Sequence, residues 1–291
     1  MNWFEALLLG LIQGLTEFLP VSSSGHLELG KVILGVNAEK SLIFTVVVHG
    51  ATVLSTIIIF YKDISELLKG LFLFKWNDNN KYIVKLIISM IPVMILGFFF
   101  KEEIESFFTG NLLFVGSMLI VTSLLLASTY LPKSNLRKIT FIDSFIIGIA
   151  QALAVLPGIS RSGATISTGL LLGNKKIVMA KFSFLMVLVP ILGANLLDVF
   201  SGEMSSQTSV GVVPLIVGFF AAFISGLFAC KWMIGIVKRQ FDLLFNLLFY
   251  NWNLSYYICL KIYATNFITK RVQFYKRGNS FYKQALFLDF F

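Results

Sequence analysis

Long blocks of apolar residues with few polar interruptions fill most of the chain. Five of them approach the roughly 20 residues that cross a bilayer as a helix. These blocks are 42–61, 82–100, 111–131, 177–200 and 210–237, and a weaker sixth covers 241–264. The pattern predicts an all-α integral membrane protein.

Two further apolar stretches, 1–34 and 141–172, are interrupted in the middle by Pro, Gly and Ser. The interruptions read LPVSSSGH over 19–26 and LPGISRSG over 156–163. Lipid cannot satisfy the backbone N–H and C=O groups that unwinding frees, so such breaks are tolerated only where protein or a wet cavity surrounds them. We therefore expect each stretch to form a re-entrant helical hairpin around a site.

The charged loops predict which side each segment faces. Segments 62–81, 132–140 and 173–181 are rich in Lys and Arg, whereas 101–110 and 201–209 are not. Cytoplasmic loops carry the excess of basic residues, so the first three are expected inside and the last two outside. Because 132–140 and 173–181 share a side, the hairpin between them enters from the cytoplasm and returns to it. The first hairpin then dips in from the outer face.

An internal repeat supports this arrangement. Shifting the chain by 138 positions aligns Gly10 with Gly148, Gln13 with Gln151, Ser22 with Ser160, Ser24 with Ser162, Gly25 with Gly163 and Gly35 with Gly173. We expect two inverted repeats, 1–131 and 141–264, each a re-entrant hairpin followed by three transmembrane helices, and then a basic, aromatic tail over 265–291. Inverted repeats place a shared site near the midplane, on broken helices.

Composition narrows the class of protein. The chain is 57% apolar and 13% charged, against about 45–50% and about 25% in soluble domains, which excludes a soluble enzyme. The net charge of +9 lies in short loops, where it sets topology, so no nucleic-acid partner is expected. Cys230 and Cys259 form neither a disulfide framework nor a metal-ligand pattern.

The ionisable residues of the apolar stretches gather at the two breaks. Glu17, His26 and Arg161 lie there among hydroxyl side chains. A charge at the bilayer centre costs at least about 2.5–3.5 kcal/mol, so it is normally paired or faces water. An Arg beside hydroxyls and the N–H groups of a new half-helix can bind phosphate oxyanions. A carboxylate and an imidazole that converge with it could catalyse phosphoryl transfer.

Each of these residues also has a structural interpretation. Glu17 and Arg161 could form a buried ion pair that joins the repeats, and the serines could cap the half-helices. His49 lies in the apolar run VVVHG over 46–50, and we interpret it as a packing residue that hydrogen-bonds within or between helices.

The segments QGLTEFLPVSSSGH over 13–26 and LPGISRSGAT over 156–165 resemble the paired motifs of the bacterial undecaprenyl-diphosphatase family, the bacitracin-resistance phosphatases. The resemblance covers residues 1–238. It implies hydrolysis of undecaprenyl diphosphate to the monophosphate and inorganic phosphate, in the bacterial plasma membrane, at a site open to the outer face. The product is the lipid carrier used again in cell-wall synthesis.

The resemblance also implies roles for individual residues. Glu17 would be the essential carboxylate, His26 the general base or nucleophile, Ser23 a nucleophile or phosphate ligand, and Arg161 the diphosphate clamp. Supporting substrate-binding residues would be Ser22, Ser24, Gln151, Ser160, Ser162 and Thr165. A divalent cation, Mg²⁺ or Ca²⁺, would bind Glu17 and Gln13. Many members of the family have Glu where this chain has Gln13, which weakens the expected metal site.

Three points stay open. The runner-up function is a lipid-phosphate transporter or flippase, because inverted repeats with re-entrant hairpins are also transporter architecture, and a purely structural membrane protein is a third alternative. Beyond Arg239 the chain has one glycine, Gly278, and many aromatics, and we hypothesise a changed reading frame or a replaced terminus there. Whether two copies form a homodimer is not encoded in any pattern that we recognise.

Overall fold

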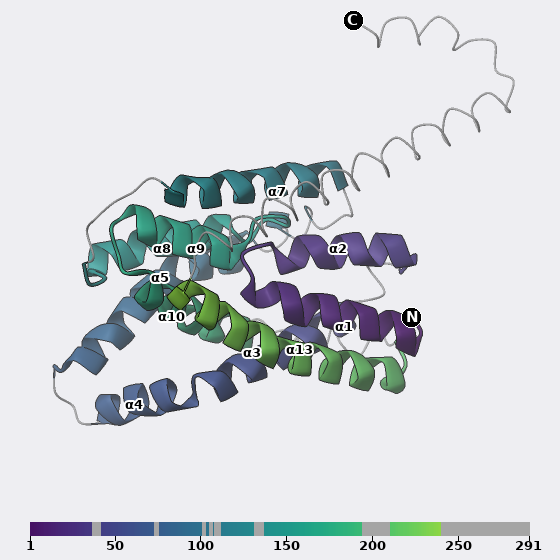
Figure 1. Cartoon of the computed structure of the whole chain (residues 1–291), viewed down its shortest axis with the longest axis horizontal. Helices are drawn as coiled ribbons and strands as arrows, with labels where there is room; N and C mark the ends of the chain where they lie inside the picture. The colour runs from purple at the N-terminus through teal and green to yellow at the C-terminus, as the bar shows by residue number, and fades with distance from the viewer. Residues whose placement is uncertain are drawn as a thin grey trace, which may run out of the picture.

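The computed structural model describes residues 1–36, 42–72, 76–100, 103–104, 107, 112–130, 137–193 and 210–239. This part of the chain is almost entirely helical (Figure 1). The expected segments 194–200, 241–264 and 265–291 lie outside the described residues.

Both broken stretches consist of two helices joined by an unwound segment. The first contains α1 (Trp3–Phe18) and α2 (Ser23–Leu34), and the second contains α8 (Phe141–Leu153) and α9 (Arg161–Leu171). Both hairpins begin with a capping box, Asn2 with Glu5 and Thr140 with Asp143. In a capping box, the two side chains satisfy backbone N–H groups that have no partner within the helix.

The second helix of each hairpin begins with a serine cap. The Ser22 hydroxyl accepts a hydrogen bond from the Gly25 N–H at 3.3 Å, and the Ser160 hydroxyl accepts one from the Gly163 N–H at 3.1 Å. The backbone at the breaks is unusual, with φ of 69° at Ser22 and 99° at Gly158. Positive φ is disfavoured for residues with a Cβ, so Ser22 holds a strained conformation that its capping bond helps to stabilise.

Further helices of the described residues pack around the hairpins or extend from them. They are α3 (Leu42–Ile59), α4 (Tyr61–Phe72), α5 (Asp78–Phe99), α10 (Lys176–Met186) and α13 (Val212–Arg239), and α7 (Leu112–Ala127) covers the two second helices, α2 and α9. Among the described residues, three helices are long and apolar enough to cross a membrane: α5, the stretch 176–193 that contains α10, and the 212–235 part of α13. The bent pair of α3 and α4 would be a fourth span.

The structure differs from the expected spans in two places. The block 42–61 ends as a helix at Ile59, and the chain then turns by 75° into α4, which the sequence pattern placed in a loop. The turn falls where a mostly apolar pattern without charged residues other than His49 becomes amphipathic, from Lys62 onward. The block 111–131 is also shorter as a helix, because α7 gives way to a 3-10 turn at Ser128–Tyr130.

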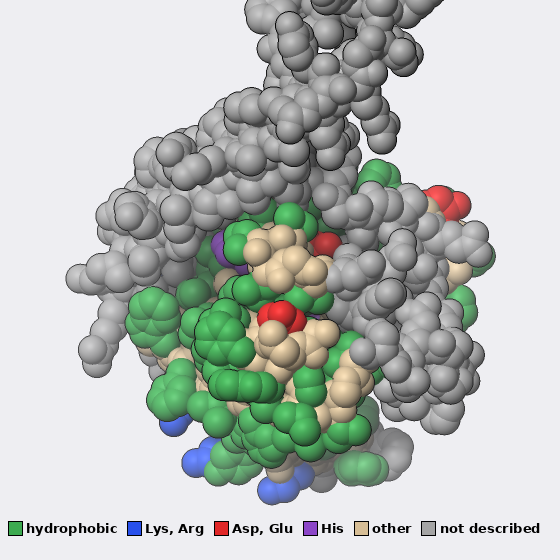
Figure 2. Space-filling model, turned by 90° about the vertical axis from the view of Figure 1, so that its right-hand side faces the viewer, with side chains coloured by type: hydrophobic (Ala, Val, Ile, Leu, Met, Phe, Trp, Pro, Cys, Tyr) green, Lys and Arg blue, Asp and Glu red, His purple; other side chains and the backbone are tan. Residues whose placement is uncertain are grey.

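The outer surface suits a lipid environment. Phe98, Ile142 and Val212 are 81%, 73% and 71% exposed, and hydrophobic side chains are prominent among the described residues on the face shown in Figure 2. In water such a surface would aggregate, whereas in hydrocarbon it needs no partner.

The first helix of each hairpin packs against a long helix from the other half of the chain. α1 lies along α13, and α8 lies along α5 (Figure 1). Glycines permit the close approach: a Cβ at Gly10 would meet the Gly218 carbonyl oxygen, and one at Gly148 would meet the carbonyl oxygen of Ser89. The two halves therefore pack closely against each other.

The two breaks also touch. A Cβ at Gly25 would lie 3.2 Å from Gly158 Cα, and one at Gly163 would lie 3.4 Å from Pro20 Cβ. The Ser162 hydroxyl donates a hydrogen bond to the Leu19 carbonyl oxygen at 3.3 Å. The start of each second helix is thus packed against the unwound segment of the other hairpin.

Candidate active site

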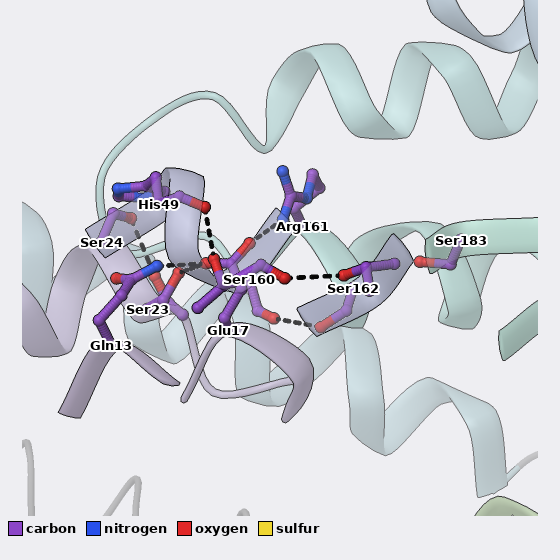
Figure 3. A network of polar contacts seen from close by, with 12 residues as sticks. Gln13, Glu17, Ser23, Ser24, His49, Ser160, Arg161, Ser162 and Ser183 are labelled. Atoms are coloured by element: carbon purple, nitrogen blue, oxygen red, sulfur yellow. Dashed lines mark hydrogen bonds and ion pairs between the residues drawn. The ribbon is translucent and has the colours of Figure 1, made fainter. Parts of the chain in front are cut away.

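Glu17 is the centre of the polar network between the breaks (Figure 3). Its Oε1 accepts a hydrogen bond from Arg161 Nη2, which closes an ion pair between residues 144 positions apart. Its Oε2 accepts from Gln13 Nε2 at 2.8 Å and from the Ser23 hydroxyl at 2.6 Å. Four residues that the sequence predicted as a site are therefore in direct contact.

The carboxylate is held by groups from both hairpins. Gln13 and Glu17 lie one turn apart on α1, so their side chains share a face. Ser23 is the first residue of α2 and Arg161 the first residue of α9. The N-termini of two half-helices, each with unpaired N–H groups and a partial positive charge, thus converge on one carboxylate.

Arg161 is more accessible than its partner. The Arg161 side chain is 26% exposed, whereas that of Glu17 is 6% exposed. Within the described part of the chain, the other N–H groups of the guanidinium have no hydrogen-bond partner. A guanidinium that uses one N–H group on Glu17 can offer the rest to an oxyanion, since its five donors form a planar fork.

The remaining hydroxyls at the breaks shape the backbone around this centre. The Ser22 and Ser24 hydroxyl oxygens lie 3.3 Å apart, and those of Ser160 and Ser162 lie 3.4 Å apart. The serine caps are therefore real, as the structural interpretation expected, and they lie in the same network as Glu17. Thr165 is turned away, because its hydroxyl lies 2.7 Å from that of Ser183 on α10.

Within the described residues, neither His26 nor Gln151 hydrogen-bonds to Glu17 or Arg161. His26 Nδ1 lies 2.9 Å from the Ser22 carbonyl oxygen, one turn back on α2. Gln151 on α8 is 2% exposed, and both of its amide atoms are buried without a partner within the described residues. Gln13 bonds to Glu17, but the residue four positions after Gln151 is Val155, which offers no polar group.

The sequence analysis expected His49 to hydrogen-bond within or between helices, and it does so within α3. His49 also belongs to the polar network drawn in Figure 3, which the sequence analysis did not predict. Its Nδ1 lies 2.8 Å from the Thr45 carbonyl oxygen, which can only accept, so Nδ1 carries the proton and Nε2 is the basic atom. The signal was a polar face on α3, since Thr45, His49, Thr52 and Thr56 recur at helical spacing.

The expected cation site is only partly formed. Within the described residues, no group of three or more His, Cys, Asp or Glu side chains could hold a metal. However, Gln13 Oε1 is buried without a partner next to Glu17. Hard cations prefer oxygen ligands, and Mg²⁺ is often held by one or two carboxylates together with substrate phosphates. The residues fit a cation that is shared with a phosphate ligand.

The comparisons with known proteins agree with the motifs. The family model of the bacitracin resistance protein BacA matches residues 6–255, further along the chain than residue 238, where the resemblance was expected to end. Proteins called undecaprenyl-diphosphatase from Bacteroides fragilis, Bacteroides thetaiotaomicron and Christiangramia forsetii are each 55% identical over 243 residues. The matches cover 82% of this chain and 91%, 92% and 91% of those relatives. The chain belongs to the bacitracin resistance protein BacA family.

Proposed function

We propose that this membrane protein is an undecaprenyl-diphosphatase, which releases inorganic phosphate from undecaprenyl diphosphate and returns undecaprenyl phosphate to cell-wall synthesis. Removal of the lipid diphosphate would also explain bacitracin resistance. The observation that carries the proposal is the Arg161 guanidinium, held by Glu17 at the junction of two half-helix N-termini. The relatives that share the chain's sequence carry the name of this enzyme.

Arg161 is proposed as the diphosphate clamp. In the absence of substrate its charge is balanced by Glu17. A diphosphate brings more negative charge and more oxygen acceptors than one carboxylate, so it competes for the guanidinium. The N–H groups at the starts of α2 and α9 add favourable interactions with an anion. Ser22, Ser24, Ser160 and Ser162 are proposed as supporting donors around the phosphates.

Ser23 is proposed as the nucleophile, with Glu17 as its base. The Ser23 hydroxyl already donates to Glu17 Oε2 at 2.6 Å, within the reach expected of an activated pair. As Oγ attacks the terminal phosphorus, its proton would pass to the carboxylate, and the bond to the bridging oxygen would break to release undecaprenyl phosphate. A water would then hydrolyse the phosphoserine.

His26 is proposed as the base for that water. Its Nδ1 faces the Ser22 carbonyl oxygen and must carry the proton, so Nε2 is free to accept one. Gln13 and Glu17 would hold Mg²⁺ or Ca²⁺, which when bound neutralises charge on the phosphate oxygens. Acid quenching with substrate labelled in the terminal phosphate tests the covalent step. Label on the wild-type protein and none on Ser23→Ala is expected, whereas labelled Ser23→Ala would refute the role of Ser23.

Two inverted repeats are proposed as the architecture. A two-fold axis exchanges contacts, so that if residue i meets j, the equivalent of j meets the equivalent of i. Gly25 lies on Gly158, and their equivalents 138 positions away, Gly163 and Pro20, lie on each other. The pairing of α1 with α13 and of α8 with α5 follows the same exchange. Simple tandem repeats do not produce this reciprocity.

The repeats would place the two hairpins in opposite leaflets, with the site open to the outer face. Single cysteines at Asn2 and Thr140, in a background without Cys230 and Cys259, test this topology in sealed vesicles of known orientation. An impermeant thiol reagent should label one position from outside and the other only after the vesicles are opened. Equal labelling from outside would exclude the inverted arrangement.

Phosphate release tests the activity itself. Purified wild-type protein in detergent should release phosphate from undecaprenyl diphosphate. Glu17→Gln should not, because it keeps the shape of the side chain but removes its charge and one of its two acceptor oxygens. Vesicles that contain labelled undecaprenyl phosphate distinguish the enzyme hypothesis from the transporter hypothesis. The transporter would be favoured if the label moved between leaflets while neither the wild-type protein nor Glu17→Gln hydrolysed the diphosphate.

A further inference from the structure

Helix α4 (Tyr61–Phe72) has no role in the site, yet its position is sharply defined. It leaves α3 at an angle of 75° and lies at the lower edge of the fold in Figure 1. Its sequence is amphipathic, with apolar residues on one side and charged residues on the other. A helix of this kind that follows a transmembrane helix at a steep angle is suited to lie in the membrane surface.

Contacts on one side fix the rotation of α4 about its axis. Asp63 forms an ion pair with Lys181 of α10. The side-chain amides of Asn77 and Asn79 donate to the carbonyl oxygens of Gly70 and Glu66, at 3.5 Å and 3.2 Å. Ile64 and Leu67 pack against the main hydrophobic core.

The adjoining side presents an apolar strip without a partner in the described residues. Tyr61, Leu68, Leu71 and Phe72 are 59%, 50%, 45% and 73% exposed. Lys62 and Lys69 are also exposed, and they lie two helical turns apart along one border of the strip. The Lys62 ammonium lies 5.8 Å from the centre of the Tyr61 ring, so the cation stays beside the apolar surface.

We propose that α4 is an interfacial helix that binds anionic phospholipids on the lysine-rich side of the membrane. The apolar strip would enter the boundary between acyl chains and headgroups, and Lys62 and Lys69 would pair with lipid phosphates. Charge favours this occupant over a second copy of the chain, because a symmetric contact along the strip would bring the same lysines together. The proposal is independent of the phosphatase activity.

Lipid selectivity of the full chain in bilayers tests the proposal. Spin-labelled phosphatidylglycerol and phosphatidylcholine would be compared for the fraction immobilised by the protein. The variant Lys62→Ser/Lys69→Ser should lose preference for phosphatidylglycerol by up to about fivefold per lysine, since each basic residue near an anionic surface contributes a similar attraction. Lys175→Ser, which removes an exposed charge at the residue that precedes α10, is the matched control.

The outcomes separate the alternatives. Phosphate release by the double variant at the wild-type rate would show that it is folded. Unchanged selectivity in that folded variant would overturn the proposal. The proposal would also fail if Leu68→Glu converted a dimer to a monomer in detergent while lipid selectivity stayed the same, because the strip would then be an interface between copies.

Discussion

Ser23 and Arg161 stand 138 positions apart, at the first residue of two different half-helices, and both donate a hydrogen bond to the carboxylate of Glu17. The chain thus uses the same structural position twice, once for a hydroxyl and once for a guanidinium. Because the two donors reach opposite oxygens of one carboxylate, the distance between the hairpins is fixed by Glu17. Changes at either donor should affect the site before they affect the fold.

Arg161→Lys should lower kcat/KM by about 100- to 1,000-fold, the range expected when a donor to the developing oxyanion is lost. Lysine keeps the positive charge that balances Glu17, so the protein should still fold, but it lacks the planar fork that binds two phosphate oxygens. Phosphate release and the melting temperature in detergent measure the two effects. Lys175→Arg is the control, and an Arg161→Lys protein with normal turnover would contradict the clamp.

Substitutions of the neighbouring residues Ser22 and Ser23 should distinguish helix capping from catalysis. Ser22→Ala removes the cap of α2 and should cost about 1 kcal/mol of stability. Because Ser22 is proposed only as a supporting phosphate donor, the folded variant should lose part of its turnover but not all of it. Ser23→Ala removes the donor to Glu17 and should abolish turnover with little change in melting temperature. If Ser22→Ala were inactive and Ser23→Ala active, Ser22 and not Ser23 would be the nucleophile.

Gln13→Glu should strengthen cation binding. It places a second carboxylate one turn from Glu17, and more negative ligands tighten a hard-cation site. We expect the Mg²⁺ concentration for half-maximal activity to fall about tenfold, equivalent to about 1.4 kcal/mol. Without cation the two carboxylates repel, so the melting temperature should drop and recover on addition of Mg²⁺. An unchanged Mg²⁺ dependence would place the cation elsewhere.

The two histidines should differ in the size of their effects. His26→Gln removes the proposed base and should lower kcat by about 100-fold or more. His49→Gln can still donate to the Thr45 carbonyl oxygen, and it loses only the interaction with Glu17, so a loss of roughly tenfold is expected. Comparable KM values for both variants would show that the substrate still binds. If kcat fell further in His49→Gln than in His26→Gln, His49 and not His26 would be the general base.

Gln151→Met should stabilise the protein. Both amide atoms of Gln151 are buried without a partner among the described residues, and each buried unsatisfied group costs about 1–3 kcal/mol. Methionine has similar length and no polar atom, so a higher melting temperature with unchanged phosphate release is expected. Loss of activity at an unchanged melting temperature would instead show that Gln151 contacts the substrate, as the sequence predicted.

The hairpins and their shared centre could be predicted because their signals are local. Pro20 and Gly158 interrupt apolar stretches, and few other features of a membrane protein do so. Because the expected topology brings the two breaks together, Glu17 and Arg161 could be expected to form an ion pair, and the structure places them in contact.

Features that depend on three-dimensional packing were harder to predict. His49 has apolar neighbours in sequence, and its hydrogen bonds to Thr45 and Thr52 stay within α3. Only the spacing of the threonines on α3 could therefore have indicated a polar face. The bend between α3 and α4 has neither Pro nor Gly: Phe60 N–H still bonds to Thr56 C=O, and Phe60 C=O accepts from Ile64 N–H. The change from an apolar to an amphipathic pattern indicates where the chain bends between α3 and α4, but it does not indicate the angle of the bend.

The contact between Glu17 and Arg161 also constrains how the gene can change. The acid comes from one end of the coding sequence and the guanidinium from the middle, so neither half alone encodes a working hydrolase. A substitution that shifts one break by a fraction of an ångström requires an answering substitution in the other. Divergence between relatives should therefore occur in matched steps across the two breaks, and most freely on the lipid-facing helices.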